Sequence, residues 1–220
     1  MPSLSIEQVK EYITDYVKIY KIAPYLHFQV RESAAELYGD EHNELFIQAA
    51  YEPYAVEVDG KVGRVDINTG TNPSFGELHK SLNHEIIGHY GLTTYTPQEK
   101  RQILENIIIH KDELSDLWEY VEKNYKNEPL YLKAEEVFCL VAESITPAMH
   151  LEKPIDEFCF DPLTKESLTN LVLHTANQLA LGFSKRQTFY LDDITQIQLN
   201  IERSQQHLEL EDELEDDLER

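Results

Sequence analysis

The chain has 220 residues, of which 41% are hydrophobic and 27% charged, as is usual for a globular domain. Its 41 acidic residues outnumber its 19 Lys and Arg, and the net charge is -22. A field of this sign repels phosphate backbones and anionic lipids, so we expect neither direct phosphate binding to nucleic acid nor membrane binding. The sequence shows no membrane span or signal peptide, and Cys139 and Cys159 form no C-x-x-C pair. These features indicate a cytoplasmic protein.

The first third of the chain predicts one helix and a small antiparallel sheet. Ser5 and Gln8 have capping-box spacing and open an amphipathic helix over 5–20. Residues 25–31 alternate as a strand does, and residues 54–67 form two alternating runs around Asp59-Gly60, a hairpin signal. A loop over 68–76 then leads into a helix over about 77–90.

The rest of the chain reads as helical. The expected helices cover 97–125, with a break near His110, and then 131–145, 163–182 and 193–220. Strands followed by helices predict an α+β fold, with the small antiparallel sheet and its hairpin packed on a mainly helical body. We expect one domain over 1–205 and a frayed tail over 206–220, because like charges crowd its end.

The segment His84-Glu85-Ile86-Ile87-Gly88-His89 is the most informative in the chain. In the H-E-x-x-H zinc pattern the two histidines are four residues apart and share a helix face. Here they are five apart, which on a regular helix turns the rings roughly 140° from each other. A single π-bulge would restore the shared face, and Gly88 would make that distortion cheap. The spacing therefore predicts a distorted helix with both histidines on one metal ion.

A third ligand is expected from residues 134–143, a helix that is apolar apart from three glutamates. Glu136 and Glu143 share one face, and Glu135 points about 100° away. A buried carboxylate is costly unless it is paired, and a dication compensates it. We therefore expect Glu136 as the ligand, with Glu135 as its rival and Glu143 as the acceptor for a ligand histidine N–H.

The segments HEIIGHYGL and AEEVFCLVAE resemble the metallopeptidase domain in large polyvalent proteins of phages and conjugative plasmids, which are mobile elements. The H-E-x-x-G-H spacing is also similar to dipeptidyl peptidase III. The resemblance covers about 54–145 and implies a zincin-like, gluzincin-like zinc site with His84, His89 and Glu136 as ligands and Glu85 as general base. Five residues separate the glutamate pair from Ala142-Glu143, where dipeptidyl peptidase III has two, so that comparison does not choose between Glu135 and Glu136.

These residues together predict a zinc metallopeptidase that hydrolyses a peptide or protein substrate. Zinc with three protein ligands activates a water molecule, and Glu85 would take its proton. Candidates for stabilising the oxyanion are Tyr90, Tyr131 and His150, and His79 is a further residue that an irregular helix would bring near the ion. The hairpin edge Val62 to Ile67 could hold an extended peptide by strand addition.

Three other interpretations fit the same sequence. The net charge suits an acidic, non-enzymatic protein that binds a basic partner or imitates DNA. Two histidines and one carboxylate also describe non-haem Fe(II) oxygenases, although Glu85 beside a ligand favours hydrolysis and zinc. A site retained only for structure would bind zinc without turnover.

Overall fold

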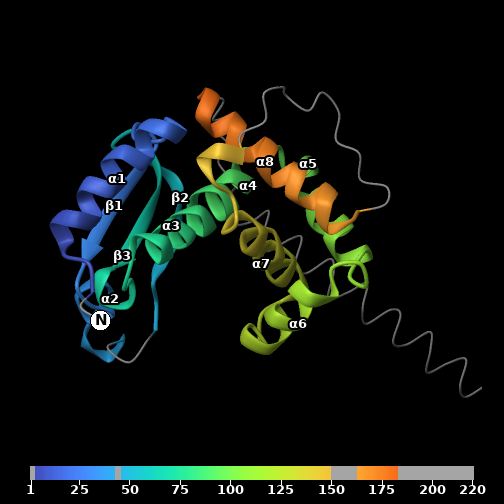
Figure 1. The fold of residues 1–220 in the computed structure, drawn as a ribbon, viewed down its shortest axis with the longest axis horizontal. Coiled ribbons are helices and arrows are strands. Elements are labelled where there is room, and N and C mark those ends of the chain that lie inside the picture. The colour runs from blue at the N-terminus through green and yellow to red at the C-terminus, as the bar shows by residue number, and fades with distance from the viewer. Residues whose placement is uncertain (1–2, 43–45, 150–162, 183–220) are drawn as a thin grey trace, which may run out of the picture. The chain divides into compact units, whose positions relative to one another are not determined.

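The computed structural model describes residues 3–42, 46–149 and 163–182 (Figure 1). The chain divides into two units, Met1–Thr188 and Phe189–Arg220. The second unit lies outside the described residues, as do the helix expected over 193–220 and the tail over 206–220. The single domain over 1–205 therefore stays a prediction. None of the described helices is both long and apolar enough to cross a membrane.

The N-terminal elements follow from local signals in the sequence. Helix α1 (Ile6–Tyr20) begins at Ser5, which forms the expected capping box with Gln8. Strands β2 (Ala49–Val58) and β3 (Lys61–Asn68) form the expected hairpin. Asp59 and Gly60 have φ of 49° and 78°, the left-handed pair that a tight two-residue hairpin turn requires. Between β1 (Leu26–Arg31) and β2 lie the short helices α2 (Ala34–Tyr38) and η1 (Asp40–His42).

The sheet is mixed, whereas the sequence predicted an antiparallel one. Its order is β1-β3-β2, with β1 parallel and β2 antiparallel to β3. The long connection from β1 to β3, which includes β2, permits the parallel pairing. Because β3 is hydrogen-bonded on both sides, the hypothesis that Val62 to Ile67 binds a peptide by strand addition is wrong.

The α+β class is confirmed, and the helices lie close to the expected ranges. Thr69–Thr71 (η2) leads to α3 (Phe75–Asn83), and His110 ends α5, which confirms the expected break. The remaining elements are a π-helix, η3 (His84–Tyr90), α4 (Gly91–Thr93), α5 (Pro97–Ile109), α6 (Ser115–Asn124), α7 (Leu130–Ala142), η4 (Pro147–Met149) and α8 (Lys165–Leu181).

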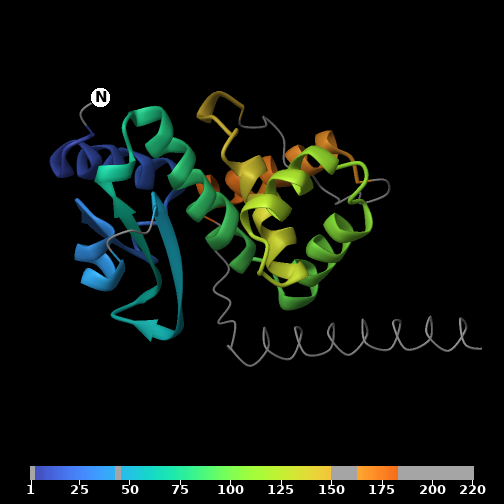
Figure 2. The ribbon, with the colours of Figure 1, turned by 90° about the horizontal axis from the view of Figure 1, so that it is seen from below.

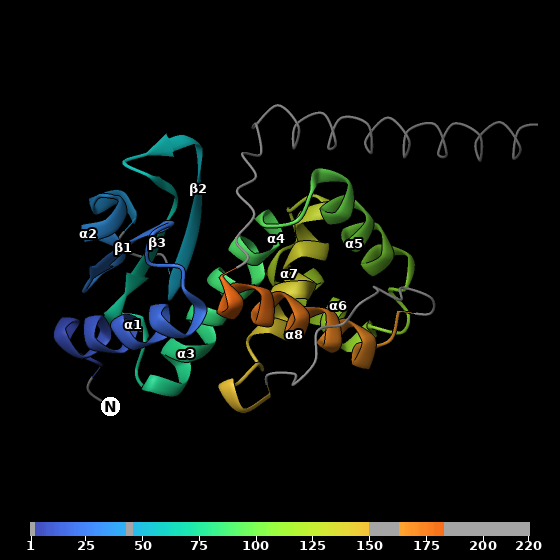
Figure 3. The same ribbon diagram turned by 90° about the horizontal axis from the view of Figure 1, so that it is seen from above.

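Helix α7 is the centre of the helical part. It packs against η3, α5, α6 and α8, as Figures 2 and 3 show from opposite sides. Its apolar sequence suits this position, because a helix that is covered on several sides needs apolar residues around its circumference. The sheet reaches the same region through β2, where the ring of Tyr51 lies 5.9 Å from that of Tyr90 on η3. Helices η3 and α7 therefore meet in the interior, and this contact builds the site.

Candidate metal site

The π-helix brings the two histidines together. Residues His84–Tyr90 form one continuous π-helical stretch, so the distortion predicted from the five-residue spacing is confirmed. The ring centroids of His84 and His89 lie 5.1 Å apart. Gly88 also allows close packing, because a Cβ there would lie 2.5 Å from Cys139 Sγ on α7. The helix distortion and the short distance between η3 and α7 thus both place the histidine pair beside α7.

Each histidine is oriented by a glutamate, Glu135 of α7 or Glu143 at its C-cap. His84 Nδ1 lies 3.0 Å from Glu143 Oε1, and His89 Nδ1 lies 2.9 Å from Glu135 Oε1. A carboxylate only accepts hydrogen bonds, so each Nδ1 carries the proton and donates it. The Nε2 atoms are then the coordinating nitrogens when both rings are neutral. Metal-bound histidines are commonly oriented in this way, and Glu143 has the supporting role that the sequence predicted.

Glu136 faces both Nε2 atoms. Its Oε2 lies 3.2 Å from His84 Nε2, and its Oε1 lies 3.5 Å from His89 Nε2. A tetrahedral zinc ion with ligands at about 2.0–2.1 Å holds those ligands about 3.3 Å apart. The carboxylate is largely buried, and His84 and the hydroxyl of Tyr125 are its hydrogen-bonding neighbours. The three side chains therefore match the donor types and the spacing of a metal site.

Glu135 has a different role from Glu136. Its Oε1 accepts from His89, and its Oε2 lies 2.7 Å from Lys100 Nζ on α5. Burial raises the pKa of Glu135, but Lys100 and His89 outweigh burial and lower the pKa to about 2. Both oxygens of Glu135 therefore contact groups other than the Nε2 atoms of His84 and His89. The structure places Glu136 between the histidines and Glu135 behind one of them.

Glu85 is held at the edge of the sheet. Its side chain is buried, and its Oε2 accepts a hydrogen bond of 2.7 Å from the backbone N–H of Tyr51 on β2. This N–H fixes one oxygen of the carboxylate that follows His84 in the chain. A carboxylate positioned in this way has the geometry of a proton acceptor.

The carboxylates also shift the pKa of the histidines. Burial lowers the pKa of His84, but Glu136 and Glu143 outweigh it and raise the pKa to about 10. For His89, Glu135 and Glu85 likewise outweigh burial and raise the pKa. Without a metal the acidic cluster therefore favours protonated rings, and a bound cation would replace those protons.

Cys139 is a second group within reach of the histidines. A ligand atom of each of His84 and His89 and the Sγ of Cys139 all lie within 4.8 Å of one another. The thiol is fully buried under Gly88, and burial together with the charge of Glu136 raises its pKa. A carboxylate carries its charge without losing a proton from a buried thiol, and the oxygens of Glu136 lie 3.2 and 3.5 Å from the Nε2 atoms, which favours Glu136 over Cys139 as a candidate ligand.

The other candidates lie elsewhere. Tyr131 interacts with Glu105 and Arg101, and Tyr90 is buried against Tyr51. Both ring nitrogens of His79 are occupied, Nδ1 by Tyr12 and Nε2 by the carbonyl of Ile145, so His79 is not placed as a ligand. His150 lies outside the described residues.

Three contributors could not be read from the sequence. They are the backbone N–H of Tyr51, the ammonium of Lys100 and the hydroxyl of Tyr125. Burial and the charge of Glu136 raise the pKa of Tyr125, which keeps a protonated phenol near the proposed ligand. No local pattern marks these groups, because each comes from an element that contacts the site only through tertiary packing.

The pair of Lys100 and Glu135 predicts a pH dependence of stability in the metal-free protein. Because the folded pKa of Glu135 is about 2 and its ordinary value is 4.5, this group stabilises the fold above pH 4.5 and loses that contribution as pH falls towards 2. The shift corresponds to about 3 kcal/mol. In Lys100→Met the pKa of Glu135 should rise, so urea unfolding should show much of this contribution already lost at pH 5. Lys80→Met, which removes an exposed pair with Glu77, is the control. Equal loss in both variants would contradict the prediction.

Comparison with known proteins gives one informative relative. No family model and no solved structure matches the chain. The chain is 32% identical over 192 residues to a protein of Escherichia coli named DNA primase TraC. The match covers 79% of this chain but only 13% of that protein. The match leaves about a fifth of the chain uncovered. If the alignment is continuous and leaves out only the two ends of the chain, it includes the segment from His84 to Glu143.

This comparison overturns the expected function. The chain was predicted to be a zincin-type metallopeptidase, similar to the polyvalent-protein domain and to dipeptidyl peptidase III, with a peptide substrate and no nucleic-acid partner. The matched protein is instead named as a DNA primase, and no peptidase family matches. The error has a physical cause, since two histidines, a carboxylate ligand and a neighbouring base specify metal and proton chemistry but not the substrate. Net charge was also a poor guide, because it describes the average field and not one site.

Proposed function

We propose that this chain is a zinc-binding domain that acts in DNA priming, with His84, His89 and Glu136 as ligands. The similarity to a primase over 79% of the chain supports the biological role. The chain spans about an eighth of that relative's length, so the priming activity of a whole protein is itself part of the proposal.

The observation that carries the proposal is the position of Glu136. Its two oxygens lie 3.2 and 3.5 Å from the Nε2 atoms of His84 and His89, while the Nδ1 atoms of both rings are held by other glutamates. A surface ion pair would need no such orientation of both rings. A zinc ion bound to these atoms would supply an open, Lewis-acidic position for water or for a phosphate oxygen.

The surrounding side chains set the charge of the centre. Glu85, Glu135, Glu136 and Glu143 contribute four carboxylates, and Lys100 is their nearby cation. A dication that replaces the protons of His84 and His89 would leave the net charge of this cluster unchanged, but it would add an open position that a phosphate oxygen could occupy. Glu85, held by the Tyr51 N–H, would accept a proton from a water molecule at the centre. An acidic chain can thus engage nucleic acid locally although its overall field opposes binding.

The metal part of the proposal is tested by elemental analysis. We expect about one zinc ion per chain in wild-type protein purified in metal-free buffer and then reloaded, and far less in His84→Ala and in His89→Ala. His110→Ala is a matched control, because that histidine ends α5 and its Nδ1 bonds the carbonyl oxygen of Asn106 in the same helix. A wild type without zinc, or variants that keep it, would overturn the ligand assignment.

The nucleic-acid part is tested separately with fluorescently labelled single-stranded DNA. In anisotropy titrations at low salt, we expect binding to the zinc-loaded chain and at least tenfold weaker binding after chelation, since the ion would supply the open position for a phosphate oxygen. Binding that is unchanged by chelation, or absent in both forms, would argue against a metal-dependent role in priming.

A further inference from the structure

A hydrogen-bond network, buried at Asn83 and Ile145, joins α3 to the residues that follow α7. The carbonyl oxygen of Ile145 accepts from Asn83 Nδ2 at 2.6 Å and lies 3.2 Å from His79 Nε2. Asn83 is fully buried at the end of α3, and Ile145 is fully buried just after α7. Two side chains from one helix thus hold the backbone that follows another.

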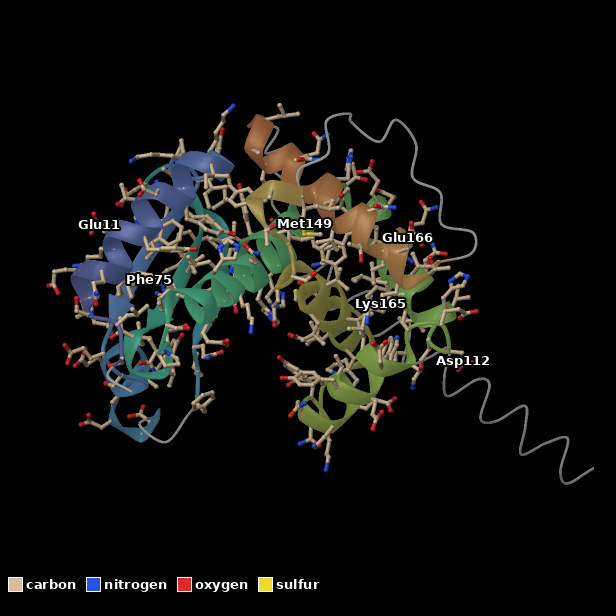
Figure 4. All side chains as sticks on the ribbon, in the orientation of Figure 1. Glu11, Phe75, Asp112, Met149, Lys165 and Glu166 are labelled. Atoms are coloured by element: carbon tan, nitrogen blue, oxygen red, sulfur yellow. The ribbon has the colours of Figure 1, made fainter. Side chains whose placement is uncertain are left out.

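Two tyrosines of α1 complete the network. Tyr16 OH donates to Asn83 Oδ1 at 2.7 Å, and Tyr12 OH lies 2.8 Å from His79 Nδ1. Because a carbonyl can only accept, His79 Nε2 carries the proton, and Nδ1 accepts from Tyr12. Phe75, labelled in Figure 4, stacks on Tyr12 with 5.5 Å between ring centroids and closes the outer side. The hydrogen bonds of Asn83 and His79 therefore run from α1 through α3 to the end of α7.

The network is next to the metal residues in sequence on both sides. Asn83 immediately precedes His84, and Ile145 is two residues after Glu143, the partner of His84 Nδ1. We infer that Asn83 and His79 are positioning residues of the proposed zinc site, which fix Glu143 opposite His84 by anchoring the carbonyl of Ile145. This inference rests on the proposed function, because the residues act through a proposed ligand.

The physical reason is the cost of an unpaired buried polar group. If Asn83 lost its amide, the carbonyl of Ile145 and the hydroxyl of Tyr16 would each lose a buried partner. The turn after α7 would then shift to recover hydrogen bonds, and Glu143 would move with it. His84 would lose the acceptor that holds its Nε2 towards Glu136.

The experiment compares zinc affinity among folded variants, by competition with a chromophoric chelator well below each unfolding midpoint. Asn83→Leu and His79→Leu should weaken zinc binding by about tenfold or more, the range seen when support of a ligand is lost. His79→Gln keeps a donor near the Nε2 position and should stay within about threefold of wild type. Asn124→Leu, on the exposed face of α6, is the control.

A second readout separates positioning from general stability. In metal-free protein, the Nδ1 proton of His84 should give a hydrogen-bonded NMR resonance that Asn83→Leu removes and Asn124→Leu retains. If Asn83→Leu does not fold, Tyr16→Phe removes only the hydroxyl that orients Asn83 and should show the same loss to a smaller degree. A wild type that binds no zinc contradicts the proposed function, and the resonance still tests the positioning. Folded variants with unchanged affinity and resonance would overturn this inference.

Discussion

Gly88→Ala is expected to destabilise the protein and to weaken zinc binding together. The new Cβ would lie 2.5 Å from Cys139 Sγ, 3.0 Å from its Cβ and 3.1 Å from its Cα. Backbone of α7 is among these contacts, so rotation of one side chain cannot relieve the overlap. Overpacking of this kind costs about 1–3 kcal/mol, against about 1 kcal/mol that alanine gains over glycine inside a helix. We expect a lower urea midpoint and, because η3 must move from α7, zinc affinity reduced by at least tenfold.

Two further variants make the Gly88 prediction specific. Gly76→Ala on α3 is the matched control, because its Cβ would meet only Ser74 Oγ at 3.7 Å and the substitution should be neutral or stabilising. Cys139→Ala removes the atom at 2.5 Å and should recover part of the loss when combined with Gly88→Ala. A Gly88→Ala protein with wild-type stability and zinc affinity would show that η3 and α7 are not held at this distance.

Glu136→Gln and Glu135→Gln form the pair with the next largest expected effects. Both changes keep the shape of the side chain and remove its charge. Glu135 supports His89 and contacts Lys100, so its loss should reduce zinc affinity by about 10–100-fold. Glu136 faces both Nε2 atoms, so its loss should exceed that range, because an amide oxygen does not supply a ligand charge.

The zinc affinities of the two glutamine variants, measured by the same chelator competition, decide between the ligands. Because Glu135→Gln removes the negative charge that faces the Lys100 ammonium, Lys100→Met combined with Glu135→Gln should recover part of the lost stability. A larger loss of affinity in Glu135→Gln than in Glu136→Gln would reverse the assignment. Equal, small losses in both would favour Cys139 as the third ligand.

Short-range features of the fold could be predicted from the sequence. The capping box at Ser5, the hairpin turn at Asp59-Gly60 and the π-helical distortion at His84 all depend on residues within a few positions of one another. Helical periodicity also placed Glu136 and Glu143 on one face of α7. Local sterics and hydrogen bonding determine such features, so a single sequence contains the necessary information.

Three-dimensional packing decided the rest of the site. The parallel partner of β3, the Tyr51 N–H on Glu85 and the Lys100 ion pair join residues far apart in the chain. The choice of Glu136 over Glu135 also depended on how α7 is rotated against η3, and periodicity left this rotation open.

The chain by itself therefore determined its local elements and a short list of candidate metal ligands. Only the tertiary structure decided which of them face one another, because burial and long-range pairing set the rotation and spacing of whole elements. Neither the sequence nor the tertiary structure identified the substrate, because the same ligand set serves different reactions. The similarity to the primase is what replaced the expected peptidase function.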